Sequence, residues 1–488
     1  MMNEITIKVE LIERLEKVGK EMLALAAELK GVRAESRISM DELKAVEKKH
    51  GKLARELVAF LDEFDIKATV TKVTVGPIVS RVVFTIPQGT RFDAVTSLKD
   101  NIMATFRASS IRIEAPVCGE DAIAIELPNA KRQDVELKPV LKRGVPKGCN
   151  LPLFLGKTST GEDVVDDLAT LPHLIIGGAV GQGKTVAINS IICGLISNFS
   201  PEEVRLILAD PKCVEFSGYA GLPHLVMPVI TTTSKFVFAM NWAVAEMEKR
   251  LKMFARAQCR NIQDFNKSGK GNAPYIVIIV DELADFMNAA SKEIVPSISR
   301  LTALARATGI HLILATQRSD AKVLSGTVKA NVPGRMAFKT CSKIDSRTIL
   351  DERGAEDLIG RGDALYRLKD GRLMRIQVAK ISDKEIVKVV KKAMKGYDKA
   401  PLLVNAEDEP EIQRTEPISR NDESDYKAAI EVIKKTNRAS VSHLQRNLGF
   451  GYNHAAKIIK MLEERGVVAP AKGLVGARTI LMDLSEEK

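Results

Sequence analysis

Apolar positions change their spacing several times along the chain, and each change marks a different kind of element. Over residues 11–29 they recur at alternating intervals of four and three, the a/d spacing of a short coiled coil. A second helical stripe covers residues 40–64 and starts at a capping-box pattern, Ser39 with Glu42. We expect residues 1–65 to form a helical hairpin, which packs either on its own chain or between subunits.

Strand-like alternation then replaces the helical spacing. It is interrupted by a Gly-Pro pair at 76–77 and a Pro-Gln-Gly triplet at 87–89, both typical of turns. One helix is expected over residues 95–108. We therefore predict a small α+β domain over residues 66–130. Its expected strands are Thr69–Val75, Val79–Ile86, Ile111–Glu114 and Ala122–Leu127.

The longest part of the chain alternates β-rich apolar runs with helical segments. Such alternation is typical of βαβ units, which build a mainly parallel sheet covered by helices. We predict an α/β domain over residues 131–399, with any nucleotide site at the carboxyl ends of its strands. The expected strands are Leu174–Ile176, Val204–Leu208, Tyr275–Val280, His311–Ala315 and Arg335–Phe338.

The last part of the chain differs in composition. Residues 400–423 are acidic, polar and proline-containing, which is typical of a flexible linker. Residues 424–488 form a basic unit with three helical patterns, and residues 467–482 have the pattern of a β wing. We predict a winged helix-turn-helix domain. The helical patterns cover Tyr426–Lys435, Val441–Leu448 and Asn453–Arg465.

Composition narrows the class of protein. The chain has 488 residues, of which 45% are apolar, so it can build several packed domains. The formal charge of +11 favours a polyanionic partner, although charge alone does not decide. Six cysteines without a Cys-x-x-Cys pair argue against a zinc site or a disulfide framework. The longest apolar run, residues 276–280, is far shorter than the roughly 20 residues of a bilayer helix. We expect a soluble, cytoplasmic protein without membrane contact.

A phosphate-binding motif follows the strand predicted at Leu174–Ile176. It fits GxxxxGK[ST], and a helix is expected directly behind it. Glycines let backbone N–H groups surround phosphates, and the helix N-terminus adds a favourable dipole. We predict that Lys184 binds the β- and γ-phosphates of ATP and that Thr185 binds Mg²⁺. The motif consists of Gly178, Ala179, Val180, Gly181, Gln182, Gly183, Lys184 and Thr185.

Two further strand ends supply candidate catalytic groups. An apolar strand delivers Asp281 and Glu282 at its carboxyl end. We expect Asp281 to bind Mg²⁺ through water and Glu282 to orient and activate the attacking water, which predicts an ATPase. Gln317 follows the next predicted strand and is a candidate γ-phosphate sensor. The alternative is a polar strand end without that role.

Several longer strings accompany the P-loop. They are Pro172-His173-Leu174, Asp210-Pro211-Lys212, Asp281-Glu282-Leu283-Ala284-Asp285, Ala305-Arg306-Ala307-Thr308-Gly309-Ile310-His311-Leu312, Ala315-Thr316-Gln317-Arg318, Lys329-Ala330-Asn331 and the run Ser342–Asp351. Together and in this order they resemble the FtsK/SpoIIIE family of DNA translocases. The resemblance extends over about residues 66–485, with a small α domain before the motor and a DNA-reading γ domain after it.

The resemblance implies a RecA-like motor that works as a hexameric ring around double-stranded DNA, with ATP between neighbouring subunits. An arginine of the neighbour then completes each site. Arg335 is the first candidate and Arg306 the second, and the alternative for either is an ordinary salt bridge. The membrane segments typical of full-length bacterial members are absent from this sequence, so we expect a soluble paralogue or a phage or plasmid protein.

A motor that runs along any sequence must hold phosphates, which Lys and Arg on pore-facing loops do. The candidates are Lys343 and Arg347 in one loop, and Lys369 and Arg372 in a turn that also suits a plain hairpin tip. In the winged helix, the recognition helix is expected to present residues to a major groove, although such domains also bind proteins. Those candidates are Tyr452, Asn453, His454 and Lys457.

Relatives with this γ domain sense short DNA sequences that set direction, and sometimes contact a recombinase. Two other functions remain open from the residues alone. One is a conjugation or secretion coupling ATPase, which the DNA-reading unit at 424–484 disfavours. The other is a DNA-binding regulator switched by nucleotide, which Glu282, Gln317 and an arginine in trans disfavour.

Overall fold

The computed structural model describes residues 40–117, 119–320, 322–368, 370–397, 422–436, 439–450, 452–469 and 480–481. The chain divides into two compact units between Ala406 and Glu407. The coiled-coil pattern over residues 11–29 and most of the predicted linker lie outside the described residues, so both stay predictions.

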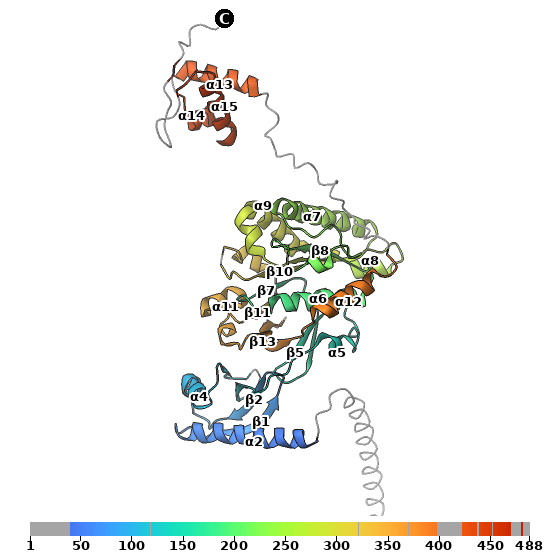
Figure 1. Cartoon of the computed structure of the whole chain (residues 1–488), viewed down its shortest axis with the longest axis vertical. Coiled ribbons are helices and arrows are strands. Elements are labelled where there is room, and N and C mark those ends of the chain that lie inside the picture. The colour runs from blue at the N-terminus through green and yellow to red at the C-terminus, as the bar shows by residue number, and fades with distance from the viewer. Residues whose placement is uncertain are drawn as a thin grey trace, which may run out of the picture. The chain divides into compact units, whose positions relative to one another are not determined.

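A small antiparallel sheet opens the first unit, in the strand order β1-β2-β4-β3. Helix α2 lies along this sheet (Figure 1). Its Leu57 and Leu61 are both 0% exposed and share a core with Phe84 and Ile125 of the strands. The helical stripe predicted at residues 40–64 therefore packs on the small sheet. The elements are α2 (Met40–Asp62), β1 (Thr69–Val75), β2 (Val79–Thr85), α3 (Phe92–Thr96), α4 (Lys99–Thr105), β3 (Arg112–Glu114) and β4 (Ile123–Pro128).

The single helix predicted over residues 95–108 was wrong, because two short helices occupy this stretch. The Leu98 N–H donates to Val95 O, three residues back, at the end of α3. This tighter turn ends the first helix before α4 begins. Val95 and Ile102 nevertheless both reach the core of the small domain, each at 0% exposure.

A nine-stranded sheet among the described residues forms the centre of the larger domain, in the order β6-β5-β13-β12-β11-β7-β10-β9-β8. The block from β11 to β8 is parallel. The rest, from β6 to β12, is antiparallel and attached through β11. The sheet is thus mixed, and the prediction of a mainly parallel sheet was wrong, because half of its strand pairings are antiparallel. Its strands are β5 (Pro152–Thr158), β6 (Asp163–Asp167), β7 (Leu174–Gly177), β8 (Val204–Ala209), β9 (Tyr275–Val280), β10 (Ile310–Thr316), β11 (Gly334–Phe338), β12 (Asp363–Arg367) and β13 (Leu373–Val378).

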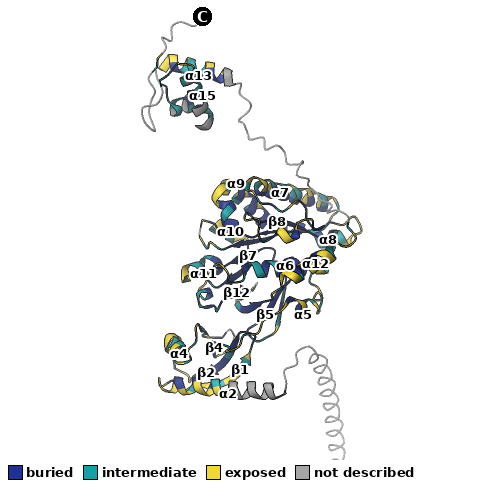
Figure 2. Cartoon of the chain, viewed as in Figure 1, coloured by how far each residue is buried: buried dark blue, intermediate teal, exposed yellow. Residues whose placement is uncertain are grey.

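Alternate residues of each central strand enter two separate cores. In β9, Val277 and Ile279 face one core, and Ile278 and Val280 face the other. A strand that is covered on both faces can be apolar at every position, which explains the continuous apolar runs in the sequence. Figure 2 shows the buried strands between partly exposed helices. The predicted α/β fold is confirmed, and each of the five predicted central strands is present within one or two residues.

The helices divide between the two faces of this sheet. Residues of α5, α6 and α12 contribute to one core, and residues of α7, α9, α10 and α11 to the other. Helix α8 packs against the end of α7 through Phe254 and Phe265, whose ring centroids are 4.9 Å apart. The helices are α5 (Leu137–Leu141), α6 (Lys184–Asn198), α7 (Thr233–Arg256), α8 (Ile262–Lys267), α9 (Leu283–Leu304), α10 (Gly326–Ala330), α11 (Lys343–Leu350) and α12 (Asp383–Met394).

The second unit contains three helices around their own core, in which Ala429, Leu444, Ile458 and Leu462 are each 0% exposed. Ser440 begins α14 as an N-cap, because its hydroxyl accepts from His443 N. Of the predicted wing, the described residues contain one antiparallel bridge, between Val468 and Ile480. The helices are α13 (Asp422–Thr436), α14 (Val441–Leu448) and α15 (Tyr452–Glu464). Across the described part of the chain, every helix is too short or too polar to span a bilayer.

Candidate nucleotide site and DNA-contacting residues

The P-loop connects the end of β7 to the start of α6, at the carboxyl edge of the parallel block. Gly178 and Gly183 have φ values of 151° and 121°, which favour glycine. A Cβ on Gly178 would lie 2.7 Å from Phe338 Cβ, and one on Gly183 would lie 2.8 Å from Gly362 Cα. Both glycines are therefore required by backbone conformation and by close packing, and the loop keeps a shape in which N–H groups can line a phosphate pocket.

Lys184 and Asp281, 97 residues apart, meet inside the site. The ammonium donates to Asp281 Oδ1 at 2.7 Å and also to the Asp281 main-chain oxygen, and the two side chains are 3% and 2% exposed. A buried lysine needs such a partner, because an unpaired charge is costly away from water. The sequence placed both residues at one site, and the structure brings them together.

Glu282 is fixed by the neighbouring strand β10. Its Oε1 accepts from the Thr316 hydroxyl at 2.7 Å, and its Oε2 accepts from the Gln317 main-chain N–H at 2.9 Å. It also caps α9 by accepting from Ala284 N. The residue is 2% exposed. Glu282 and Gln317 are thus adjacent, as predicted from the two strand ends, and the contact involves the main chain of Gln317.

Glu215 is a group at this site that the sequence did not single out. Its carboxylate accepts from the Thr185 hydroxyl at 3.3 Å. Burial, and then the nearby charge of Asp281, raise the pKa of Glu215. Asp210 holds the loop in place, because its carboxylate accepts from the main-chain N–H groups of Lys212, Glu215 and Phe216. The Asp-Pro-Lys string at the end of β8 was the sequence feature that could have indicated a structured loop at this site.

These side chains fit a nucleotide with a divalent cation. Lys184, the P-loop cation, pairs with Asp281, and its charge also acts on Glu215, so two carboxylates lie near it. Among the described residues no three His, Cys, Asp or Glu side chains are grouped to hold a metal by themselves. Proteins commonly bind Mg²⁺ through one or two side chains together with water and nucleotide phosphates. Thr185 and Asp281 remain the side chains predicted to hold it.

Arg335, the first candidate for a trans arginine, is buried within its own subunit. Its guanidinium donates to Val332 O at 2.8 Å, to Ile349 O at 3.0 Å and to Lys329 O at 2.7 Å. The residue is 5% exposed. This is the environment of an arginine that holds loops together. Arg306, the second candidate, is exposed.

The predicted pore residues lie on a helix and a turn of the larger domain; the loop predicted for Lys343 and Arg347 was wrong, because both residues lie on α11. Lys343 and Arg347 are both exposed on α11, and Arg372 is exposed in the turn between β12 and β13. Lys343 and Arg372 line the same cavity of about 730 Å³, which opens between the small sheet and the large one. Arg372 also pairs with Asp370 at 2.6 Å. Lys369 lies outside the described residues.

In the second unit, the predicted DNA-contacting residues all fall on α15. His454 is engaged inside the unit: its Nε2 lies 2.8 Å from Asp425 Oδ2 of α13, and its ring meets Phe450 edge-on. Its side chain is 16% exposed. Tyr452 and Asn453 begin the helix and Lys457 follows one turn later. The side chains of these three lie outside the described part, so their contact with DNA stays a prediction.

Comparisons with known proteins match each part of this architecture. The FtsK/SpoIIIE family profile matches residues 147–320, the FtsK alpha domain matches residues 34–129 and the FtsK gamma domain matches residues 420–483. The alpha-domain match includes α2, in agreement with its packing on the small sheet. The gamma-domain match covers all three helices of the second unit.

Curated relatives extend the similarity over most of the chain. A protein of Clostridium tetani, named DNA translocase FtsK, is 42% identical over 86% of this chain and 58% of its own. A protein of the same name from Leptospira interrogans is 40% identical over 87% of this chain and 46% of its own. This chain thus spans about half the length of the curated relatives it matches. Among solved structures, the pCW3 conjugation coupling protein TcpA is 24% identical, covers 70% of this chain and 99% of its own, and has a TM-score of 0.49. On the family profiles and the curated relatives together, the chain belongs to the FtsK/SpoIIIE family.

Proposed function

We propose that this protein is an ATPase that moves along double-stranded DNA. The observation that carries the proposal is the fixed carboxylate of Glu282, held by Thr316 and Gln317 beside the pair of Lys184 and Asp281. A nucleotide-binding switch needs the P-loop alone. A carboxylate held rigidly at the phosphate edge of the sheet has the position required to act on water.

In the proposed mechanism, ATP with Mg²⁺ supplies the phosphoryl group and the charge that polarises it. Lys184 leaves its contact with Asp281 and binds the β- and γ-phosphates. Thr185 and Asp281 would hold Mg²⁺, which would neutralise negative charge on the phosphates. Glu282 keeps an unused lone pair on its carboxylate, with which it accepts a proton from the attacking water. Gln317 reports the state of the γ-phosphate through its main-chain contact with Glu282.

The assembly we propose is a homohexameric ring around DNA, with each ATP completed by an arginine from the next subunit. The exposed side chain of Arg306 supports its assignment as that arginine more than the buried one of Arg335 does. Lys343, Arg347, Lys369 and Arg372 are the proposed phosphate contacts. We further infer that the winged-helix domain reads DNA sequence to set direction, that a recombinase is a possible second partner of that domain, and that the protein acts in the cytoplasm.

Steady-state ATPase and nucleotide-binding measurements with and without linear duplex DNA test the proposal. Wild-type hydrolysis should increase when DNA is added. Lys184→Ala should lose nucleotide binding, because the lysine contacts ground-state phosphates. Glu282→Gln should retain binding and lose hydrolysis by at least about 100-fold, the range typical of a general base. Undiminished turnover by Glu282→Gln removes that residue from the catalytic role, and hydrolysis that ignores DNA rejects the motor.

A further inference from the structure

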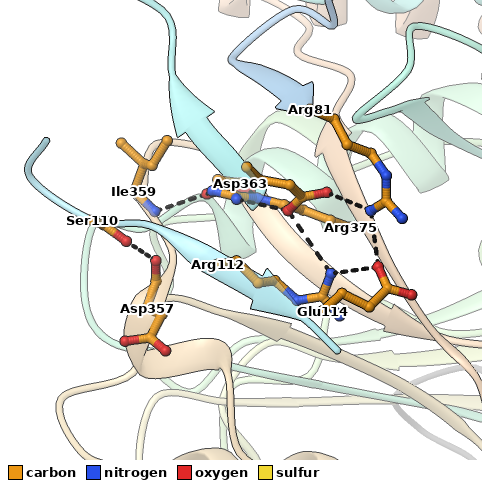
Figure 3. Close-up of polar contacts among 9 residues, drawn as sticks. Arg81, Ser110, Arg112, Glu114, Asp357, Ile359, Asp363 and Arg375 are labelled. Atoms are coloured by element: carbon orange, nitrogen blue, oxygen red, sulfur yellow. Dashed lines mark hydrogen bonds and ion pairs between the residues drawn. The ribbon is translucent and has the colours of Figure 1, made fainter. Parts of the chain in front are cut away.

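Six charged side chains form a network where the small sheet meets the large one. Three are arginines and three are carboxylates, so their formal charges cancel. Figure 3 shows the cluster between β2 and β3 of the small domain and β12 and β13 of the larger one. Its members are Arg81, Arg112, Glu114, Glu126, Asp363 and Arg375.

Among these six residues, Arg375 alone pairs with a carboxylate of each domain. It donates to both oxygens of Asp363, at 2.9 and 2.7 Å, and its Nη1 donates to Glu126 Oε2 at 3.0 Å. The three side chains are 2%, 0% and 1% exposed. Burial raises the pKa of Glu126, but the charges of Arg112, Arg375 and Arg81 outweigh it and bring the value to about 2. Glu126 is therefore ionised, and its charge is needed to balance the arginines.

Asp363 links Arg375 to the loop that lies next to the P-loop. Its Oδ2 accepts from Ile359 N at 2.7 Å, which closes the short loop of residues 359–363. Within that loop Gly360, Arg361 and Gly362 have φ values of 90°, 55° and 90°. Three successive residues in the left-handed region do not hold this shape by local preference, least of all at the arginine. The loop therefore depends on contacts such as the one to Asp363.

The P-loop rests directly on this short loop. Gly362 N donates to Gln182 O at 2.7 Å, and the two backbones approach so closely that a Cβ on Gly183 would lie 2.8 Å from Gly362 Cα. A displacement of the loop of residues 359–363 must therefore move the P-loop, since packed backbones cannot interpenetrate.

The small domain reaches the same region at a second point. The Ser110 hydroxyl donates to Asp357 O (Figure 3). Lys99 pairs with the Asp357 carboxylate. Asp357 precedes Ile359 by two residues. The small domain therefore also contacts the residue that leads into the loop of residues 359–363.

We propose that Glu126 is a positioning residue for the nucleotide site: it acts through Arg375 and Asp363 on the loop that supports Gln182 and Gly183. The small domain thereby influences how well the P-loop binds nucleotide. By linkage, nucleotide binding influences the small domain equally. This inference rests on the proposed nucleotide site and goes beyond it, because it gives a side chain of the small domain a part in the motor's reaction.

The test compares Glu126→Gln with Glu114→Gln in the full chain. Both substitutions remove one negative charge from the same network on the same domain. Among the described residues, however, Glu114 pairs with Arg81 and Arg112, whereas Glu126 is the carboxylate of this domain that pairs with Arg375. Binding of a fluorescent ATP analogue with Mg²⁺ is measured for each folded variant, after the unfolding temperature has been checked. Glu126→Gln should bind about tenfold more weakly, a typical coupling between sites, and Glu114→Gln within about twofold of wild type. Equal affinities for the two variants overturn the proposal.

Hydrogen exchange on the wild-type chain avoids any folding defect of the variants. Adding the ATP analogue should slow exchange in β4, around Glu126, as well as in the P-loop. Protection confined to the P-loop contradicts the proposed coupling. A wild-type chain that does not bind the analogue at all rejects the nucleotide site itself, and so separates failure of the proposed function from failure of this inference.

Discussion

Arg335 shows why the role of a single arginine is difficult to assign from sequence. It begins the strand predicted at Arg335–Phe338, and sequence alone does not say on which side of the strand the guanidinium lies. Its three carbonyl partners belong to loops that come together only in the folded domain. Similarly, His454 was expected at the DNA surface, whereas its contact with Asp425 depends on how α13 packs on α15.

Replacement of each arginine by alanine should separate a structural role from a catalytic one. Arg335→Ala leaves three carbonyls without their donor, so the free energy of unfolding should fall by about 2–4 kcal/mol. Arg306→Ala removes an exposed side chain and should cost less than about 0.5 kcal/mol. Urea unfolding measures both. If Arg335→Ala is as stable as wild type but does not hydrolyse ATP in the ring, Arg335 and not Arg306 is the arginine that completes the neighbouring subunit's ATP site.

Two histidines buried at the junction of β7 and β10 predict a pH dependence of stability. Burial, and then the charge of His311, lower the pKa of His173 to about 3; burial lowers that of His311 to about 4. In the folded chain both rings therefore stay neutral at pH values below about 6.5, the pKa of a histidine in the unfolded chain. The unfolded chain binds protons that the folded chain does not, so stability is complete above about pH 6.5 and decreases as pH falls.

From pH 7.5 to 5.5 the free energy of unfolding should fall by about 2–3 kcal/mol, because each of the two groups contributes about 1.4 kcal/mol per pH unit only below its unfolded pKa of about 6.5. Glu126 does not contribute in this window, because a depressed carboxylate loses its stabilisation only below its unfolded pKa. Urea titrations at the two pH values provide the measurement, with His311→Gln as the comparison, which should reduce the change by about half. A stability that is flat over this range contradicts the assignment of neutral, buried rings.

Among the elements, the sequence predicted best those that a local sequence pattern marks. The five central strands were found because strands covered on both faces are continuously apolar, and the P-loop because its glycines and lysine have a fixed spacing. The antiparallel half of the sheet was not predicted. The pairing of β13 with β5, for example, joins Ile376 to Thr158, and no local sequence pattern indicates which distant strands pair. Glu215 was missed for a related reason, because its partner Thr185 lies on another βα connection.

Helix α2 was separated from the small domain by the predicted boundary at residue 65, although its apolar face packs on that domain's sheet. The boundary depended on the change from helical to strand-like spacing, and a change of period does not show whether the two elements share a core. We propose that α2 belongs to the small domain.

A matched pair of substitutions on α2 tests that placement. Leu57→Ala removes a fully buried side chain and should lower the free energy of unfolding of the small domain by about 2–5 kcal/mol. Lys52→Ala lies on the same helix in an exposed position and should change it by less than about 0.5 kcal/mol. Hydrogen exchange in β2 and β4 reports the effect locally. Unchanged exchange in Leu57→Ala would separate α2 from this core.

At the scale of the whole molecule, we propose that the large domain hydrolyses ATP, that the small domain helps to support the P-loop, and that the winged helix reads DNA sequence. The basic residues of the turn between β12 and β13 and those of α11 would hold the phosphate backbone. The predicted linker of residues 400–423 separates the motor from the winged helix in the sequence. The roles proposed for the two units can therefore be tested on each unit separately.

Displacement of a third DNA strand is the measurement that tests this account most directly, because it requires movement along the duplex and not binding alone. With ATP and Mg²⁺, the wild-type chain should release a triplex-forming oligonucleotide from a duplex that carries no special sequence. Glu282→Gln should bind the same duplex and release nothing, since it retains the nucleotide without hydrolysing it. Release by Glu282→Gln, or hydrolysis by the wild type without release, would contradict the proposal that ATP hydrolysis at this site drives movement along DNA.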